Sequence, residues 1–250
     1  MTKSLDSKKI KKHIFADVEG VCVFDTIDST NSYGKEYLLC GKPSPALILA
    51  EEQTNGRGRC GRSFYSPQST GLYMSIVYTA DSYSEDALSA TVSAGVASAL
   101  AIEELSGKDV QIKWVNDIYI DGKKAGGILC ESVFADGKMG IIVGIGINIS
   151  TDNFPVFENN VPTSTGEIDR NALAGKIYDL FFKFNSDRGV CLEEYRKRFY
   201  LLNKEITIYR ADGTKDIATA RGIDDNGGLI IELDGKREII RTGEVTVREK

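Results

Sequence analysis

A segment rich in glycine and arginine is the stretch of this sequence that could most directly do chemistry. Residues 55–67 read NGRGRCGRSFYSP. Glycine permits backbone conformations with positive φ, and each arginine carries a planar, permanently charged set of donors. The segment is therefore suited to wrap around an anion. Apolar strand candidates on both sides, 46–53 and 71–79, favour a binding loop on a rigid scaffold over an exposed loop that touches RNA.

A predicted hairpin brings a carboxylate and an ammonium group together. Asp121-Gly122 is a two-residue turn signal between two apolar runs in segment 110–132. This turn pairs Tyr119 with Lys124 and Asp117 with Gly126. Asp117 and Lys124 then lie on one face as diagonal neighbours, roughly 7 to 8 Å apart. An ordinary surface ion pair is the alternative interpretation of these two residues.

Two further polar clusters end predicted elements. Residues 28–31 read DSTN and follow a strand candidate at 20–27, so Ser29, Thr30 or Asn31 can cap a helix that runs to about Leu39. Asn148 lies near the end of an apolar, glycine-containing strand at 139–150, which belongs in the middle of a sheet covered on both faces. By themselves, a helix cap and turn chemistry explain these residues.

Helices and a change of pattern complete the expected architecture. Apolar residues at helical spacing predict helices near 85–105, 170–184 and 192–202, and residues 151–166 predict a long loop. Past Asn203 the pattern becomes short alternating runs with frequent turns, which predicts a small β-barrel. We therefore expect an N-terminal tail at 1–19, a catalytic domain at 20–202 and a small barrel at 203–250.

Composition excludes several classes of function. The formal net charge of −5 argues against a general nucleic-acid binder, despite the basic loop. The only histidine, His13, lies in the charged N-terminal segment, and the five cysteines include no CxxC pair, so neither a structural metal nor histidine catalysis is expected. No apolar run approaches the ~20 residues of a membrane span. We expect a reduced, cytoplasmic protein.

Taken in order, these clusters resemble the biotin protein ligases. The resemblance rests on DSTN, GRGRxGR, KWxND with Lys124, and GIGIN, and extends from about Val21 to the closing GEVTV. It implies an α+β fold, with a mixed sheet flanked by helices like that of class II aminoacyl-tRNA synthetases, and a C-terminal SH3-like barrel. It also implies an ATP-dependent ligase that converts biotin to biotinoyl-5′-AMP and transfers it to a lysine of a carrier domain, that of acetyl-CoA carboxylase or another biotin-dependent carboxylase.

The resemblance also implies roles for individual residues. Lys124, Arg57 and Arg59 would be catalytic. The biotin-binding residues would be Ser29, Thr30, Asn31, Gln53, Arg57, Gly58, Arg59 and Lys124. The ATP-binding residues would be Arg59, Arg62, Lys113, Trp114, Asn116, Asp117 and Asn148. Mg²⁺ would arrive with ATP, and Asp117 is a possible ligand.

Two features depart from the family pattern. Cys60 stands where many members have arginine, which weakens the charge of the loop; its three neighbouring arginines should make it the most reactive of the five cysteines. Only ~20 residues precede the first strand, fewer than the ~40 needed for a domain that folds unaided, so no DNA-binding domain is expected. A lipoate ligase of the same superfamily is the alternative function, followed by an RNA-binding module. A homodimer is possible.

Overall fold

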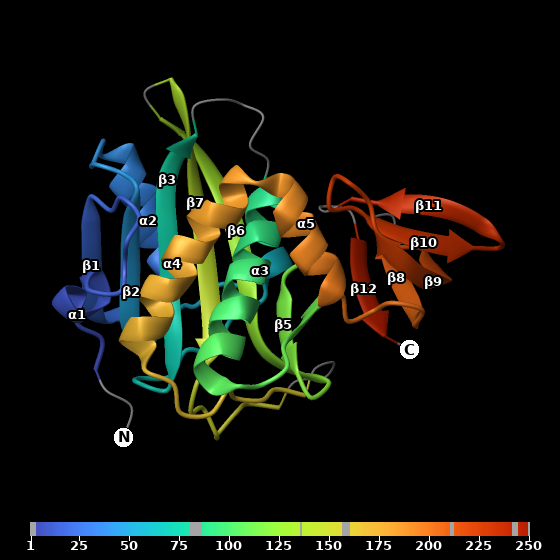
Figure 1. Ribbon diagram of the computed structural model, residues 1–250, viewed down its shortest axis with the longest axis horizontal. Coiled ribbons are helices and arrows are strands. Elements are labelled where there is room, and N and C mark those ends of the chain that lie inside the picture. Colours follow the sequence, from blue (N-terminus) through green and yellow to red (C-terminus); the bar gives the residue numbers. More distant parts are fainter. Residues whose placement is uncertain are drawn as a thin grey trace.

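The protein contains two β-sheets, a large mixed one and a small antiparallel one (Figure 1). The structure is a computed structural model that describes residues 4–80, 87–135, 137–156, 161–210, 213–241 and 245–249. The large sheet has seven strands in the order β1-β2-β3-β7-β6-β5-β4, and the small sheet has five in the order β11-β10-β9-β8-β12. The predicted mixed sheet is confirmed.

The large sheet follows the predicted strands closely. Only β1 and β2 pair in parallel; every other neighbouring pair in this sheet is antiparallel. β7 is the central strand, in agreement with its apolar sequence. The strands are β1 (Gly20–Ile27), β2 (Ala46–Gln53), β3 (Gly71–Ala80), β4 (Gln111–Lys113), β5 (Asp117–Ile120), β6 (Lys123–Ala135) and β7 (Lys138–Asn148).

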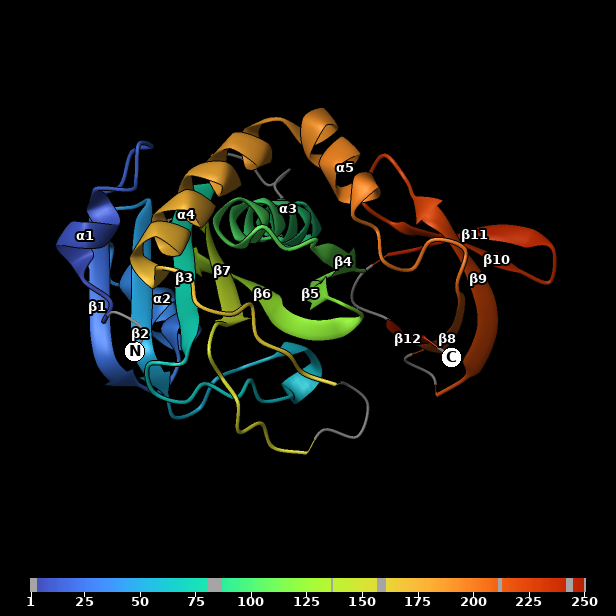
Figure 2. The ribbon, with the colours of Figure 1, turned by 60° about the horizontal axis from the view of Figure 1, so that its bottom comes forward.

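Helices cover both faces of this sheet. Helices α3 (Ala87–Ser106) and α4 (Arg170–Ser186) lie on one face and α2 (Thr30–Leu39) on the other (Figure 2). Among the described helices, α3 is long and apolar enough to cross a membrane, but 72% of its apolar window is buried in the fold, as in a core helix. Helix α5 (Arg188–Lys197) begins four residues before the predicted start at 192, because the Asp187 side chain accepts a hydrogen bond from Val190 N and caps it.

The N-terminal segment packs against β2 and α4 instead of extending away as a tail. It contains the short helix α1 (Ser7–Lys11), whose Ile10 is fully buried. Leu5 N donates to Glu51 Oε1 at 2.6 Å, and Asp6 N donates to Asn171 Oδ1 at 2.8 Å. One apolar residue among lysines was too weak a pattern to predict this contact.

The C-terminal sheet contains β8 (Glu205–Arg210), β9 (Lys215–Ile223), β10 (Leu229–Leu233), β11 (Lys236–Ile240) and β12 (Val245–Glu249). Asp234 and Gly235 both have positive φ, as the predicted two-residue turn between β10 and β11 requires. Among the described residues, β11 and β12 are the two edges of the sheet. The predicted small barrel is thus an antiparallel sheet that does not close.

A buried ion pair ties three parts of the large domain together. Arg170, at the start of α4, donates from NH1 to Glu51 Oε2 of β2 at 2.7 Å and to the Gly71 carbonyl of β3 at 3.1 Å. The Arg170 side chain is fully buried and that of Glu51 is 7% exposed. Glu51 lies two residues before Gln53, so this pair anchors the strand that leads into the glycine- and arginine-rich loop.

Replacement of Glu51 by glutamine should destabilise the protein strongly. The change leaves the Arg170 cation buried beside a neutral group, which costs about 3 to 5 kcal/mol for pairs of this kind. The free energy of unfolding from urea titrations measures the loss. Glu104→Gln is the control, because its pair with Lys176 is exposed and should contribute less than about 1 kcal/mol. Equal small losses in both variants would contradict the role given to Glu51.

Candidate active site

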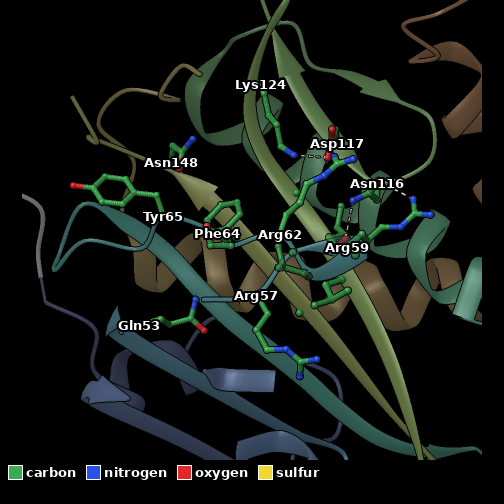
Figure 3. A pocket seen from close by; sticks show the side chains of 18 of the residues that line it. Gln53, Arg57, Arg59, Arg62, Phe64, Tyr65, Asn116, Asp117, Lys124 and Asn148 are labelled. Atoms are coloured by element: carbon green, nitrogen blue, oxygen red, sulfur yellow. Dashed lines mark hydrogen bonds and ion pairs between the residues drawn. The ribbon is translucent and has the colours of Figure 1, made fainter. Parts of the chain in front are cut away.

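A large cavity lies on the α2 face of the large sheet, with a volume of about 630 Å³ (Figure 3). Among the described residues that line it are five cations, Arg57, Arg59, Arg62, Lys113 and Lys124, and one carboxylate, Asp117. The whole chain has a net charge of −5, so the positive charge of the cavity is a local feature and not a property of the whole protein. The cavity is therefore suited to hold anions.

The cavity brings together every site residue expected from the sequence. The residues come from α2, β2, the glycine- and arginine-rich loop, the β4–β5–β6 region and the end of β7. They are Ser29, Thr30, Asn31, Gln53, Arg57, Gly58, Arg59, Arg62, Lys113, Trp114, Asn116, Asp117, Lys124 and Asn148. Figure 3 shows Gln53 and Asn116 on opposite sides, with the arginines between them.

The glycine- and arginine-rich loop folds back on itself as a flap over the sheet. Gly58 N donates to the Arg62 carbonyl at 2.7 Å, and Phe64 N donates to the Gly56 carbonyl at 2.8 Å. A Cβ on Gly56 would lie 2.4 Å from the Phe64 carbonyl oxygen, so only glycine fits there. At the tip, Cys60 and Gly61 both have positive φ. The close backbone contacts explain why glycines are spaced through this loop.

Two arginines of the flap already bind acceptors of the protein. Arg57 donates from NH1 to Glu131 Oε2 at 3.2 Å and pairs through NH2 with Oε1 at 3.0 Å. Arg59 donates from NH1 to Asn116 Oδ1 at 3.1 Å, and Asn116 Nδ2 donates to the Ile128 carbonyl at 3.0 Å. Each arginine thus reaches from the flap to the β5–β6 side of the cavity.

The predicted hairpin forms, with one correction to its register. Asp121 and Gly122 have positive φ, and Tyr119 pairs with Lys124 as expected. Asp117 pairs with Gly127 and not with Gly126, because a bulge at Ala125 inserts one extra residue into β6. The glycine beside the ion pair is consequently Gly127, and the Lys124 Nζ to Asp117 Oδ1 distance is 2.6 Å. The two side chains are 25% and 20% exposed, which makes them part of the cavity wall.

Glycines on β7 open the floor of the cavity. A Cβ on Gly144 would lie 2.2 Å from Asn31 Oδ1, and a Cβ on Gly146 would lie 2.6 Å from the Phe64 ring. These glycines let α2 and the flap come down onto the central strand. The GIGIN segment thus supplies space where a larger side chain would push these two elements apart.

Hydrogen bonds connect the residues at the α2 end of the cavity. Thr30 donates from its backbone N at 2.9 Å to Gln53 Oε1, and Gln53 Nε2 donates to Ser66 Oγ at 3.0 Å. Ser29 is the N-cap of α2, so the predicted cap is confirmed in addition to its place in the cavity. Asn31 Nδ2 donates to the Leu129 carbonyl at 3.1 Å and to Glu131 Oε2 at 2.9 Å.

The remaining expected residues have other protein contacts as well. Lys113 Nζ lies 3.4 Å from Tyr119 OH, and Asn148 Nδ2 donates to the Thr163 carbonyl at 3.2 Å. Trp114 donates from Nε1 to the Gly227 carbonyl of the C-terminal sheet at 3.0 Å and is only 7% exposed. Trp114 therefore joins the cavity wall to the second sheet, a contact that the sequence did not predict.

Sequence reasoning also missed residues that complete the site. Glu131 binds both Arg57 and Asn31, and the buried Ser75 on β3 contacts Thr30 and Asn31. Phe64 and Tyr65 line the cavity from within the segment already singled out for its arginines. Because side chains alternate between the two faces of a strand, Glu131 lies on the same face of β6 as Gly127, toward the cavity. This alternation is the sequence signal that could have identified Glu131.

The described residues include no group of three or more histidine, cysteine, aspartate or glutamate side chains that could hold a metal ion. Asp117, the one carboxylate among the described lining residues, is paired with Lys124. Mg²⁺ usually keeps several waters and binds through one or two carboxylates together with substrate phosphates. The donor set is consistent with that mode of binding and not with a protein cage.

Comparison with known proteins agrees with this geometry. Residues 23–148, about half the chain, match the biotin/lipoate A/B protein ligase family, and residues 201–248 match the biotin protein ligase C-terminal domain. The chain belongs to the biotin/lipoate protein ligase family. A relative within it, the bifunctional ligase/repressor BirA of Salmonella typhimurium, is 32% identical over 98% of this chain and 78% of its own length.

Two further members of the family match along most of their length. The biotin–[acetyl-CoA-carboxylase] ligase of Mycobacterium tuberculosis is 23% identical over 96% of this chain and 95% of its own. The solved structure of the Aquifex aeolicus biotin protein ligase in complex with biotin and ATP is 25% identical, with a TM-score of 0.78 over 93% of this chain and 100% of that one. The predicted family is confirmed.

Cysteine alkylation should distinguish the flap from the rest of the fold. Cys60 and Cys40 are exposed, whereas burial raises the pKa of the Cys130 thiol to about 12 and that of Cys191 to about 11. Because the thiolate is the reactive form, both buried thiols should remain unmodified up to pH 9. Cys60 should react first, and its preference for anionic iodoacetate over neutral iodoacetamide should exceed that of Cys40, because three arginines lie within three residues of it in the chain. Peptide mapping by mass spectrometry measures the order. Faster labelling of Cys130 or Cys191 would contradict this description of the flap.

Proposed function

We propose that this protein is an ATP-dependent biotin protein ligase. The observation that carries the proposal is the cavity in which five cations face one carboxylate, in a chain that belongs to the biotin/lipoate protein ligase family. The first reaction of such an enzyme joins two anions, the biotin carboxylate and the α-phosphate of ATP. Fixed positive charge lowers their mutual repulsion and stabilises the charge that develops at phosphorus.

In the proposed first step, a biotin carboxylate oxygen attacks the α-phosphorus of ATP. The bond from that phosphorus to the β-phosphate bridging oxygen breaks, and pyrophosphate leaves. Lys124, Arg57 and Arg59 would be the catalytic cations, since all three line the cavity. Gly58 would contribute a backbone approach to the substrates. No nucleophilic side chain is required, because the substrate carboxylate is the nucleophile.

The two ends of the cavity suit the two substrates. Ser29, Thr30, Asn31 and Gln53 supply hydroxyl and amide groups, which match the donors and acceptors of the biotin ureido ring. Arg62, Lys113, Trp114, Asn116 and Asp117 would bind ATP toward the opposite end. Asn148 would bind it from the end of β7, which Figure 3 shows apart from Asn116 and Asp117. Mg²⁺ would enter with the ATP phosphates, with Asp117 as its carboxylate, and would neutralise phosphate charge during the displacement.

In the proposed second step, a lysine amine of a carrier domain attacks the acyl carbon of biotinoyl-5′-AMP. The acyl–oxygen bond breaks, AMP leaves, and the amine loses its proton. The name of the Mycobacterium tuberculosis relative, a biotin–[acetyl-CoA-carboxylase] ligase, supports a carrier domain of that carboxylase as partner. In the same proposal, residues 20–202 form the catalytic domain and residues 203–250 form a small C-terminal domain. The proposal also includes assembly of the protein as a homodimer.

A cytoplasmic location is part of the same proposal. Its support is that all five cysteines are free and that the most apolar helix, α3, is mostly buried. A lipoate ligase is the second candidate, because the family that residues 23–148 match includes both biotin and lipoate ligases. The match of residues 201–248 to a biotin protein ligase domain favours biotin.

The proposal is tested by ATP–pyrophosphate exchange, which isolates the adenylation step. Exchange should require biotin, and lipoate at the same concentration should give only the background rate. Thermal-shift measurements should show stabilisation by biotin with ATP, since ligands that bind only the folded state raise stability, and none by RNA. Exchange that depends on lipoate in place of biotin would overturn the assignment of substrate.

Lys124→Ala should lower biotin-dependent exchange by about 10² to 10³, by analogy with the loss of a single oxyanion donor. The contact removed is one that strengthens as charge develops in the transition state. Lys123→Ala is the matched control, because Lys123 is adjacent on the same strand, is exposed and does not line the cavity. Normal exchange in Lys124→Ala, or equal impairment of both variants, would show that the role given to Lys124 is mistaken.

A further inference from the structure

Glu131 connects two residues of the site although it belongs to none of the motifs that define it. It lies on β6 and pairs through both carboxylate oxygens with Arg57 of the flap, at 3.0 and 3.2 Å. Its Oε2 also accepts from Asn31 Nδ2 of α2 at 2.9 Å. The two partners precede Glu131 by 74 and 100 residues in the chain. One carboxylate thus joins the flap to the helix at the α2 end of the cavity.

The negative charge of Glu131 fixes the orientation of the Asn31 amide. Asn31 Nδ2 faces two groups that only accept, the Glu131 carboxylate and the Leu129 carbonyl at 3.1 Å. The opposite end, Oδ1, therefore faces Ser75 Oγ at 2.7 Å and must accept the hydroxyl proton of Ser75. Both amide donors and the carbonyl of Asn31 are used within the protein.

This orientation determines the direction of the next hydrogen bonds. Ser75 has one proton, which is committed to Asn31, so its 2.7 Å contact with Thr30 Oγ1 requires the hydroxyl proton of Thr30, although Gln53 Oε1 lies 3.1 Å from the same hydroxyl. Gln53 is oriented separately, because its Oε1 accepts from Thr30 N at 2.9 Å and its Nε2 donates to Ser66 Oγ at 3.0 Å. The chain that begins at Glu131 therefore ends at the Thr30 hydroxyl, next to Gln53.

We propose that Glu131 is a positioning residue for the carboxylic acid substrate. It holds Arg57 on one side and, on the other, sets through Asn31 and Ser75 the hydrogen bonding of the Thr30 hydroxyl, one of the groups proposed to bind a cyclic urea. The inference rests on the proposed function, because it assigns the ureido ring to this end of the cavity. Glu131 acts through these residues and does not itself line the cavity.

Glu131→Gln tests the inference with little change in shape. The amide nitrogen of glutamine must face either Arg57 or Asn31, so that donors meet donors, and the charge that holds both is lost. The KM for biotin in ATP–pyrophosphate exchange should rise about tenfold, as expected for the loss of a charge-assisted hydrogen bond. The KM for ATP should stay within about twofold, because the chain does not reach Lys113, Asn116 or Asp117. Glu104→Gln, in an exposed pair with Lys176 in the helical layer, is the control and should change neither constant.

The outcomes separate this inference from the proposed function. If the unmodified protein neither binds biotin in calorimetry nor shows biotin-dependent exchange, the proposed function is wrong and the inference fails with it. If the unmodified protein is active but Glu131→Gln leaves the KM for biotin unchanged, or raises both KM values together, only the inference is overturned. If Glu131→Gln does not fold, Ser75→Ala decides, because it removes the next link and leaves every charge in place. A raised KM for biotin alone in Ser75→Ala supports the chain, and unchanged constants overturn it.

Discussion

Repulsion between like charges is the constraint on which the rest of this site depends. Five cations line one cavity, and without acceptors they would repel one another and open the flap. Three of them reach acceptors of the protein itself, since Arg57 binds Glu131, Arg59 binds Asn116 and Lys124 binds Asp117. Each acceptor lies on β6 or on the β4–β5 hairpin. The anion-binding cations are therefore held in place before any anion arrives, which reduces the reorganisation that binding requires.

Glycine is the second condition for this arrangement. The cations and amides come from elements on opposite sides of the central strand, and they meet because Gly144 and Gly146 leave room for Asn31 and Phe64. A Cβ on Gly127 would make only ordinary contact with Asp117 and Lys124, at 3.4 and 3.5 Å. A side chain at Gly144 or Gly146 would instead push α2 or the flap away from the central strand. These glycines thus allow the elements that carry the polar and charged groups to pack closely. The conformational freedom of glycine is needed chiefly at the tip of the flap, where φ is positive.

Features encoded locally were predicted from the sequence, and features set by distant contacts were not. The Asp121-Gly122 turn, the cap at Ser29 and the central strand depend on neighbouring residues, so their patterns were sufficient. The bulge at Ala125 was missed because it is set by how β6 packs against both its neighbours. Glu131 was missed because its partners lie 74 or more residues earlier in the chain. The motifs thus marked the residues that face the cavity, including the acceptors Asn116 and Asp117, but not Glu131 and Ser75.

A turn of the C-terminal sheet contacts the cavity wall. Asp224 Oδ1 accepts from the backbone N of Asn226 and Gly228 and holds this turn in shape. At its centre, the Gly227 carbonyl accepts from Trp114 Nε1. A larger residue would be strained there, because φ is positive and a Cβ would lie 3.3 Å from Val92 of α3. Trp114 stands between Lys113 and Asn116, two groups at the end of the cavity opposite Gln53. The turn contacts α3 on one side and Trp114 on the other, so the position of the small sheet bears directly on that end of the cavity. The α2 end takes its contacts from β3, β6 and the flap instead.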